Sequence, residues 1–185
     1  QVYNWGTFNN LHTVDVARKG FLITGASGSG KSTLIDAVST ILVPPIKRKF
    51  NAAASDTAKA SGRDLITYCR GAWRREHSVE VDELTRSFLR TGATWSGVNL
   101  TYSDGAGREV SAVYLMYLSA NAHVAADVKN LFLALPGQVN LADFEPIAVQ
   151  EADIGLAKRT YKDAFAINRS HRPFIAALRK QLGIP

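Results

Sequence analysis

Alternating apolar and polar side chains predict strands at the start of the chain. Residues 2–8 alternate as a half-buried strand does, Asn9-Asn10 is expected to turn, and a second strand is expected over residues 11–16. The short apolar run Phe21–Thr24 is typical of a buried strand. We therefore expect it to lie inside a sheet.

A helix is expected a few residues later. Its apolar positions recur at the spacing of one helix face and are Leu34, Ile35, Val38, Ile41 and Leu42. The run Val43-Pro44-Pro45 ends it, because proline cannot continue a helix and restricts the residue before it. Strand, glycine-rich loop and helix thus follow one another over residues 21–43.

The middle of the chain has a weaker pattern. Residues 51–59 are polar and alanine-rich and predict an exposed loop, and residues 63–71 predict a short helix that Gly71 ends. Residues 73–92 are charged and weakly periodic. The run Val79–Glu83 ends in Asp-Glu, as a metal-binding strand would, but Glu80 breaks the apolar stretch that such a strand needs.

A period of two returns at Thr94. It predicts a β-hairpin with strands near residues 95–102 and 110–118. Another strand is expected over Asn130–Leu135, and an amphipathic helix over residues 174–182, followed by Gly183.

Length and composition indicate a globular protein. The 185 residues suffice for one substantial domain, and no apolar run approaches the length of a membrane span. The only cysteine, Cys69, excludes an intrachain disulfide and favours a cytoplasmic setting. Because Gln1 stands where Met would begin a chain, we expect a fragment or a processed form.

The net charge of +6 is concentrated in two segments, residues 46–75 and 155–185. Such asymmetry suggests contact with a polyanion such as nucleic acid, and a solvated basic face is the alternative.

One stretch carries clear chemistry. Gly25–Ser32 fits the pattern G-x-x-x-x-G-K-[ST] of a phosphate-binding loop. Gly28 and Gly30 allow the backbone to fold around an anion, and Lys31 supplies a positive charge for the terminal phosphates. The Ser32 hydroxyl can ligate Mg²⁺, and the helix that follows adds the positive end of its dipole. The chain is predicted to bind a nucleoside triphosphate.

Other parts of an ATPase site are missing from the pattern. After the loop, no apolar run ends in the acidic residue that would hold the metal, and there is no LSGG-like signature. We therefore expect half of a composite site, with no catalytic residue within this segment.

Several stretches together resemble a known family. They are Tyr3–Phe8, Thr24–Ala37, Val43–Pro45, Phe50–Lys59, Arg63–Gly71 and Leu178–Ile184. The chain resembles the N-terminal head segment of SMC-like ATPases of the MukB/SbcC type, with the closest likeness to the ATPase subunit of the bacterial Wadjet plasmid-defence system.

The resemblance implies an α/β fold, that of a P-loop NTPase. The chain would be the N-terminal lobe of an ABC-type ATPase head with an antiparallel β-hairpin subdomain. Residues 1–45 would hold the first strands, the loop and its helix, residues 46–92 a basic loop and short helix, and residues 93–136 antiparallel strands. Residues 150–185 would be a basic helical region leading toward a coiled coil.

The resemblance also implies ligands, ATP and Mg²⁺. The phosphate contacts would be Ser27, Gly28, Ser29, Gly30, Lys31, Ser32 and Thr33, with Ser32 on the metal. The family often adds a metal-contacting glutamine, whose place here is taken by Tyr114, and Gln138 is the candidate substitute. DNA contacts are expected at Lys47, Arg48, Lys49, Arg63 and Arg70.

The implied activity is ATP-dependent head dimerisation and hydrolysis that drive DNA entrapment or translocation in a bacterial cytoplasm. The partners would be a second copy, kleisin and accessory subunits, double-stranded DNA and a nuclease subunit, with no membrane. The alternatives are a nucleotide-gated DNA-repair or scaffold protein of the SbcC class and a small-molecule kinase. A kinase usually has the loop strand first, whereas two strands precede the loop here.

Overall fold

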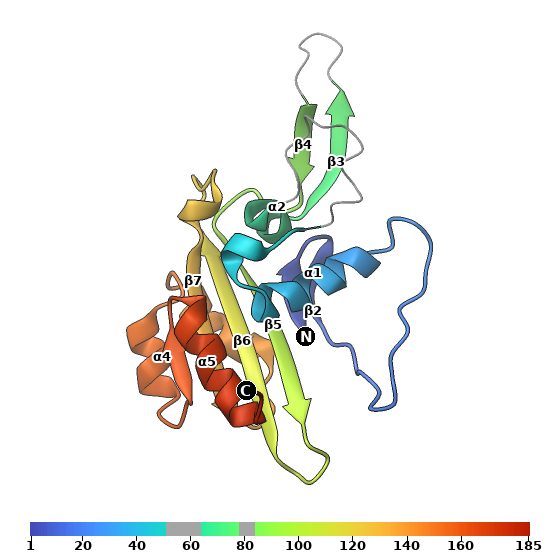
Figure 1. Ribbon diagram of the computed structural model, residues 1–185. Helices are drawn as coiled ribbons and strands as arrows, with labels where there is room; N and C mark the ends of the chain where they lie inside the picture. The colour runs from blue at the N-terminus through green and yellow to red at the C-terminus, as the bar shows by residue number, and fades with distance from the viewer. Residues whose placement is uncertain (51–63, 78–83) are drawn as a thin grey trace.

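The fold is built on one antiparallel sheet (Figure 1). The computed structural model describes residues 1–50, 64–77 and 84–185. Six strands lie in the order β2-β1-β5-β6-β7-β8, and every neighbouring pair is antiparallel. Their bounds are β1 Val2–Trp5, β2 Phe8–His12, β5 Thr94–Ser103, β6 Glu109–Leu118, β7 Lys129–Pro136 and β8 Ala166–Asn168.

Helices cover both faces of this sheet. One face carries α1 (Lys31–Leu42), α2 (Leu65–Arg70) and α5 (His171–Leu182). The other carries α3 (Glu145–Ala148), α4 (Ile154–Thr160) and the 3-10 turn η4 (Leu141–Phe144). Two further 3-10 turns are η1 (Pro45–Lys47) and η3 (Ala125–Asp127). A separate two-stranded sheet, β3 (Ala72–His77) with β4 (Leu84–Phe88), extends from the α2 end of the molecule (Figure 1).

Side-chain alternation along the long central strands creates two cores. On β6, Ala112, Tyr114 and Met116 face the α1 side, whereas Val113 and Leu115 face the α3 side. Because successive residues of a strand point to opposite faces, a strand buried on both sides reads as a continuous apolar run. Residues 112–118 form such a run, in contrast to the period of two from which this strand was predicted.

Several sequence predictions are confirmed. The hairpin forms as β5 and β6, residues 130–135 lie in β7, and α1 ends at Leu42 before the prolines. Gly71 and Gly183 end α2 and α5 in the left-handed conformation, as the glycine positions predicted.

The N-terminal strands are shorter than predicted, and their turn lies elsewhere. The chain reverses at Gly6-Thr7 instead of Asn9-Asn10, and the second strand ends at His12. Gly6 has φ +56° and its ideal Cβ would lie 2.6 Å from Thr33 Cγ2, so this position needs glycine. The turn was misplaced because Gly6 lies inside the alternating run of residues 2–8, which was interpreted as one continuous strand.

The expected buried strand at Phe21–Thr24 is not formed. Residues 13–30 run outside the sheet (Figure 1), Phe21 is 46% exposed and Leu22 is 84% exposed. A strand needs a neighbour to pair its backbone, and no described strand pairs with this run.

The apolar face of α1 is also not the buried one. The helix buries Thr33, Asp36, Ala37, Thr40 and Ile41. Of the five apolar residues on the expected helix face, Ile35, Val38 and Leu42 are exposed, and only Ile41 is fully buried.

Several elements were not predicted from the sequence. The pair β3–β4 lies in the weakly periodic region, and β8 interrupts the expected helical region at residues 150–185. The predicted loop over residues 51–59 and the run Val79–Glu83 lie outside the described residues. In the part of the chain that the structure describes, no helix is long and apolar enough to cross a membrane.

Candidate nucleotide-binding site

The candidate site is the glycine-rich loop and the first turn of α1. Gly28 and Gly30 adopt φ +81° and +91°, which L side chains rarely do. The ideal Cβ of Gly30 would lie 2.9 Å from the Phe8 ring. The backbone conformation and the contact with β2 therefore both require glycine at the N-cap of α1.

Lys31 lies over the loop. Its Nζ donates to the carbonyl oxygens of Gly25 at 2.7 Å and Ala26 at 2.6 Å, and lies 3.4 Å from Ser29 Oγ. An ammonium group has three donors and no acceptor, so the loop's own oxygens hold the charge in place beside the loop backbone. The Lys31 ammonium is therefore placed to interact with an anion bound in the loop.

The N-terminal hairpin anchors the start of α1. The indole of Trp5 is buried, and its Nε1 donates to the Thr33 carbonyl at 2.8 Å. The same ring stacks on Tyr68 of α2, with ring centroids 4.5 Å apart, and the Tyr68 hydroxyl bonds the Asp36 carboxylate of α1. The two strands that precede the loop, β1 and β2, thus help to position the helix that carries Lys31.

The hydroxyl-bearing residues of the first turn differ in exposure. Ser32 is exposed, so its hydroxyl is accessible to a metal ion bound with the nucleotide. Thr33 is buried, and its methyl carbon lies against Gly6. The Thr33 side chain therefore packs into the protein, and its assignment as a phosphate contact through the side chain is not favoured.

Gln138 is placed on the other side of the sheet from α1. Its neighbours are held there, since the Gly137 carbonyl accepts from Ser111 Oγ at 2.7 Å and the Val139 carbonyl accepts from Asn99 Nδ2 at 3.2 Å. Residues adjacent to Ser111 and Asn99 along their strands pack in the α1 core, so these two side chains point to the opposite face. Gln138 lies on the wrong face to reach a metal at Ser32.

Tyr114 does not replace a metal-contacting glutamine either. Its hydroxyl donates to Asn130 Oδ1 at 2.6 Å, and its ring stacks on Phe132 with 4.1 Å between centroids. Burial raises the pKa of its phenol far above the usual value, so it remains protonated. Tyr114 is a core residue near the C-terminal end of α1.

Arg70 is a structural residue and is corrected here from a candidate DNA contact. Its guanidinium donates to six backbone carbonyls, those of Arg90, Thr91, Gly92, Ser119, Ala120 and Ala122, at 3.0 to 3.3 Å. The residue is only 6% exposed. Because the side chain is buried and both Nη groups bond backbone carbonyls, Arg70 is not accessible to a DNA phosphate.

The remaining basic candidates divide by exposure. Arg48 donates to the Thr40 and Val43 carbonyls at 2.6 and 2.9 Å, where it satisfies the last turn of α1. Lys47 and Lys49 are exposed. Arg63 lies outside the described residues.

The first part of the chain matches a described protein family. Residues 1–57 match the family model described as the P-loop containing region of AAA domain. A search for relatives among curated proteins found no match. The matched residues hold β1, β2, the loop and α1, so this part of the chain is a P-loop segment of the type found in ATPases.

Proposed function

We propose that this chain is the ATP-binding lobe of an SMC-like ATPase head, in which a second lobe completes the site and hydrolysis acts on DNA. The observation that carries the proposal is an apolar surface directly beside the phosphate-binding loop. The loop itself supports nucleotide binding of several classes, whereas this surface supports a composite site.

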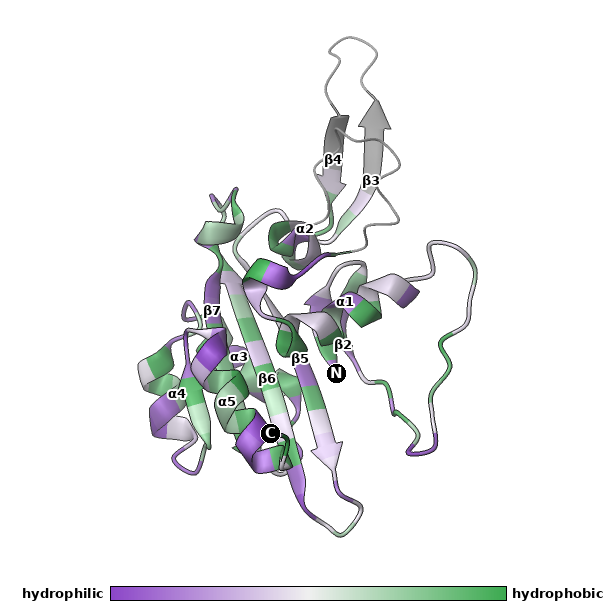
Figure 2. Cartoon of the chain, in the orientation of Figure 1, coloured by the Kyte–Doolittle hydropathy of each residue, from purple (hydrophilic) through white to green (hydrophobic). Residues whose placement is uncertain are grey.

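The surface has two parts. The first is the segment that enters the loop, where Phe21 and Leu22 are exposed although their run has the composition of a buried strand. Figure 2 shows apolar residues along this segment. The second is the exposed face of α1 with Ile35, Val38 and Leu42.

These two parts face a common apolar cavity of about 170 Å³. Among the described residues, its lining includes Val14, Val16, Phe21 and Ile23 from the entering segment and Leu34, Ile35 and Val38 from α1. Contiguous exposed apolar surface marks an interaction site. A strand from a second lobe, paired with residues 21–24 and covering α1, would bury it.

Within this lobe, the roles follow from the loop chemistry. Ser27, Gly28, Ser29 and Gly30 would hold the phosphates through their backbone, and Lys31 would neutralise the terminal ones. Ser32 fits a magnesium ion, because its hydroxyl is exposed in the first turn of α1 and oxygen is the donor that Mg²⁺ prefers. When bound, Mg²⁺ would supply charge neutralisation for the phosphates.

The finer parts of the proposal rest on the family resemblance. They are a head–head dimer that sandwiches ATP, bridging kleisin and accessory subunits, transport of DNA, a nuclease partner and a role in plasmid defence. The exposed Lys47 and Lys49 remain the candidates for DNA contact.

The test is ATP binding and turnover by the protein, with and without circular DNA, beside Lys31→Ala. We expect Lys31→Ala to weaken ATP binding by about tenfold or more, because it removes a charge-assisted phosphate contact. Lys158→Ala, at an exposed position on α4, is the matched control with the same charge change outside the loop. If DNA stimulates ATP turnover and Lys31→Ala abolishes that turnover, the result supports the proposed DNA-linked ATPase.

Other outcomes would contradict parts of the proposal. ATP-dependent dimerisation without turnover would instead establish a nucleotide-gated scaffold. Phosphate transfer that requires a small-molecule acceptor would establish a kinase.

A further inference from the structure

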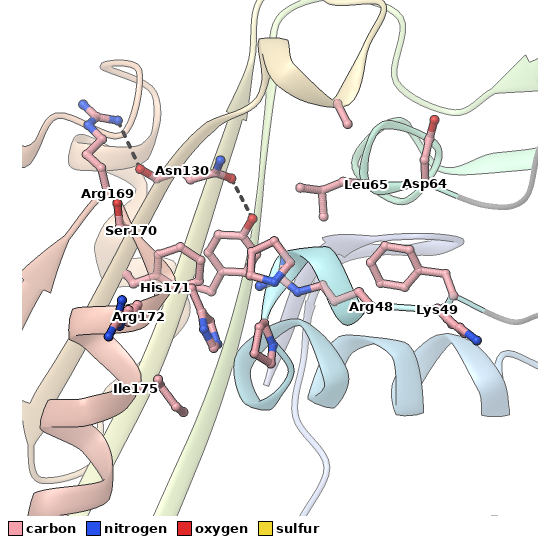
Figure 3. A pocket seen from close by; sticks show the side chains of 16 residues that line it. Arg48, Lys49, Asp64, Leu65, Asn130, Arg169, Ser170, His171, Arg172 and Ile175 are labelled. Carbon is pink, nitrogen blue, oxygen red and sulfur yellow. Dashed lines mark hydrogen bonds between the residues drawn. The ribbon is translucent and has the colours of Figure 1, made fainter.

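A second cavity lies at the opposite end of α1 from the phosphate-binding loop (Figure 3). Its volume is about 890 Å³, and it opens between the α1–η1 connection, the start of α2, the middle of the sheet and the start of α5. Helix α1 has 12 residues and rises about 1.5 Å for each, so the cavity and the loop lie about 18 Å apart along the helix. One mononucleotide cannot occupy both.

The rim of this cavity is strongly basic. Among the described lining residues, Arg48, Lys49, Arg169 and Arg172 are cationic and Asp64 is the only carboxylate. Asp64 is occupied as the N-cap of α2, where it accepts from the Thr67 backbone N–H at 2.8 Å. The local field therefore favours an anion.

The cations lie on two sides of the opening. Figure 3 shows Arg169 and Arg172 on the α5 side and Lys49 on the other. Arg169 donates from Nη1 to the carbonyls of Asn130 at 3.2 Å and Glu151 at 3.4 Å, which orients its guanidinium at the opening. Arg169, Arg172 and Lys49 are exposed and accessible to a ligand.

The wall below the rim is largely apolar. Tyr114 and Phe132 stack with 4° between their planes, and the lining continues with Pro44, Leu65 and Ile175. The amide of Asn130 is fixed beside this wall, because its Oδ1 accepts from the Tyr114 hydroxyl. An apolar wall with a few placed polar groups suits a ring system, and a basic rim suits a phosphate.

We propose that this cavity binds a nucleotide unit independently of the phosphate-binding loop, with the phosphate at Arg169 and Arg172 and the base against the wall beside Asn130. The unit can come from a free mononucleotide or from a single nucleic-acid strand. Both present the same phosphate and ring, and the experiment distinguishes them.

The experiment measures fluorescence anisotropy of labelled AMP and of labelled hexathymidylate on the protein carrying Lys31→Ala, which weakens nucleotide binding at the loop. The pocket variant is Arg169→Gln with Arg172→Gln. We expect it to weaken binding of at least one probe by about tenfold or more, because two charge-assisted contacts are lost. Loss for AMP alone identifies a free nucleotide, and loss for hexathymidylate identifies a strand.

The matched control is Arg179→Gln with Lys180→Gln. These residues are exposed in the last turn of the same helix and outside the cavity, and the charge change is the same. Arg48 is left unchanged because it bonds the last carbonyls of α1. Urea midpoints of both variants are compared to confirm folding.

Three results would overturn the proposal. They are no saturable binding of either probe, equal loss in pocket and control variants, and unlabelled inorganic phosphate competing as well as unlabelled AMP. Equal loss would indicate general charge attraction, and strong competition by phosphate would show that the apolar wall contributes nothing. All proteins in this experiment carry Lys31→Ala. The results therefore do not test ATP binding at the phosphate-binding loop, and the two proposals can fail separately.

Discussion

At the scale of single residues, the side chains of two arginines, Arg70 and Arg90, hold separate segments of the backbone together through hydrogen bonds. Arg70 joins the loops at residues 90–92 and 119–122, and Arg90 donates to the carbonyls of Gly6, Tyr68 and Cys69 at 2.7 to 3.2 Å. A guanidinium has five donors in a fixed plane, so one side chain can satisfy several carbonyls that strands and helices leave unpaired. Charge in a sequence does not distinguish this use from binding a polyanion.

We expect Arg70→Ala to lower the free energy of unfolding by about 3 kcal/mol or more, because six backbone carbonyls, one of them buried and five partly buried, lose a charged donor. The free energy of unfolding of Arg70→Lys should lie between those of the unsubstituted protein and Arg70→Ala, since an ammonium has fewer donors and no planar fork. Urea unfolding followed by circular dichroism measures both. Arg159→Ala, at an exposed position on α4, is the control and should change stability by less than about 0.5 kcal/mol. Equal midpoints for Arg70→Ala and the control would show that the carbonyl network is not stabilising.

At the scale of elements, α1 is held at both ends by other parts of the chain. Its first turn accepts a hydrogen bond from Trp5 of β1, and its last turn is bonded by Arg48 and by His171 of α5. His171 Nε2 lies 2.7 Å from the Ile41 carbonyl, and the residue is only 5% exposed. The packing of α5 against α1 therefore depends on a buried imidazole.

This imidazole predicts a pH dependence of stability. Burial lowers the pKa of His171 below its usual value of 6.5, with a smaller opposing effect from the Ile41 carbonyl and a further lowering from Arg48. Because the folded pKa is depressed, the unfolded chain binds the proton first as the pH falls. The stability that His171 contributes is complete above about pH 6.5 and decreases as the pH falls below that value.

We expect the urea midpoint to decrease between about pH 7.5 and about pH 5.5, and to decrease less in His171→Gln, which retains a donor but does not titrate. The measurement is urea unfolding at a series of pH values with constant ionic strength. Parallel pH profiles for the two proteins would mean that His171 does not cause the dependence.

At the scale of the whole molecule, the antiparallel sheet and its helices leave the surface around the phosphate-binding loop apolar and uncovered. The sheet has helices on both faces, yet Ile35, Val38 and Leu42 of α1 and Phe21 and Leu22 of the entering segment are exposed. This arrangement supports the proposed second lobe.

We expect Val38→Glu to leave the stability of the chain within about 0.5 kcal/mol, because Val38 is already exposed. In the protein with its second lobe, the same change should keep ATP binding and lower ATP turnover by about tenfold or more, since a buried charge would oppose the interface. Ala176→Glu, on the exposed side of α5, is the control. Unchanged turnover would show that this face is not an interface.

Local patterns were sufficient for much of the chain. The β5–β6 hairpin, β7, the bounds of α1 and the glycine ends of α2 and α5 each follow from residues close together in sequence. The loop motif Gly25–Ser32 likewise needs no distant contact to be recognised. In these cases the physical cause, a repeat in hydrophobicity or a backbone conformation that only glycine adopts easily, is itself local.

Contacts between distant segments decided the rest. Apolar composition at residues 21–24 and on α1 marks surface to be buried but does not say what buries it, and here no described element does. Whether a basic residue binds backbone or lies in solvent depended on the loops around it, as Arg70 and Lys47 show. The sequence by itself thus determined the chemistry of the phosphate-binding loop and most element boundaries. Only the tertiary structure decided which faces are covered and where the charges lie, because burial and pairing are set by residues far apart in the chain.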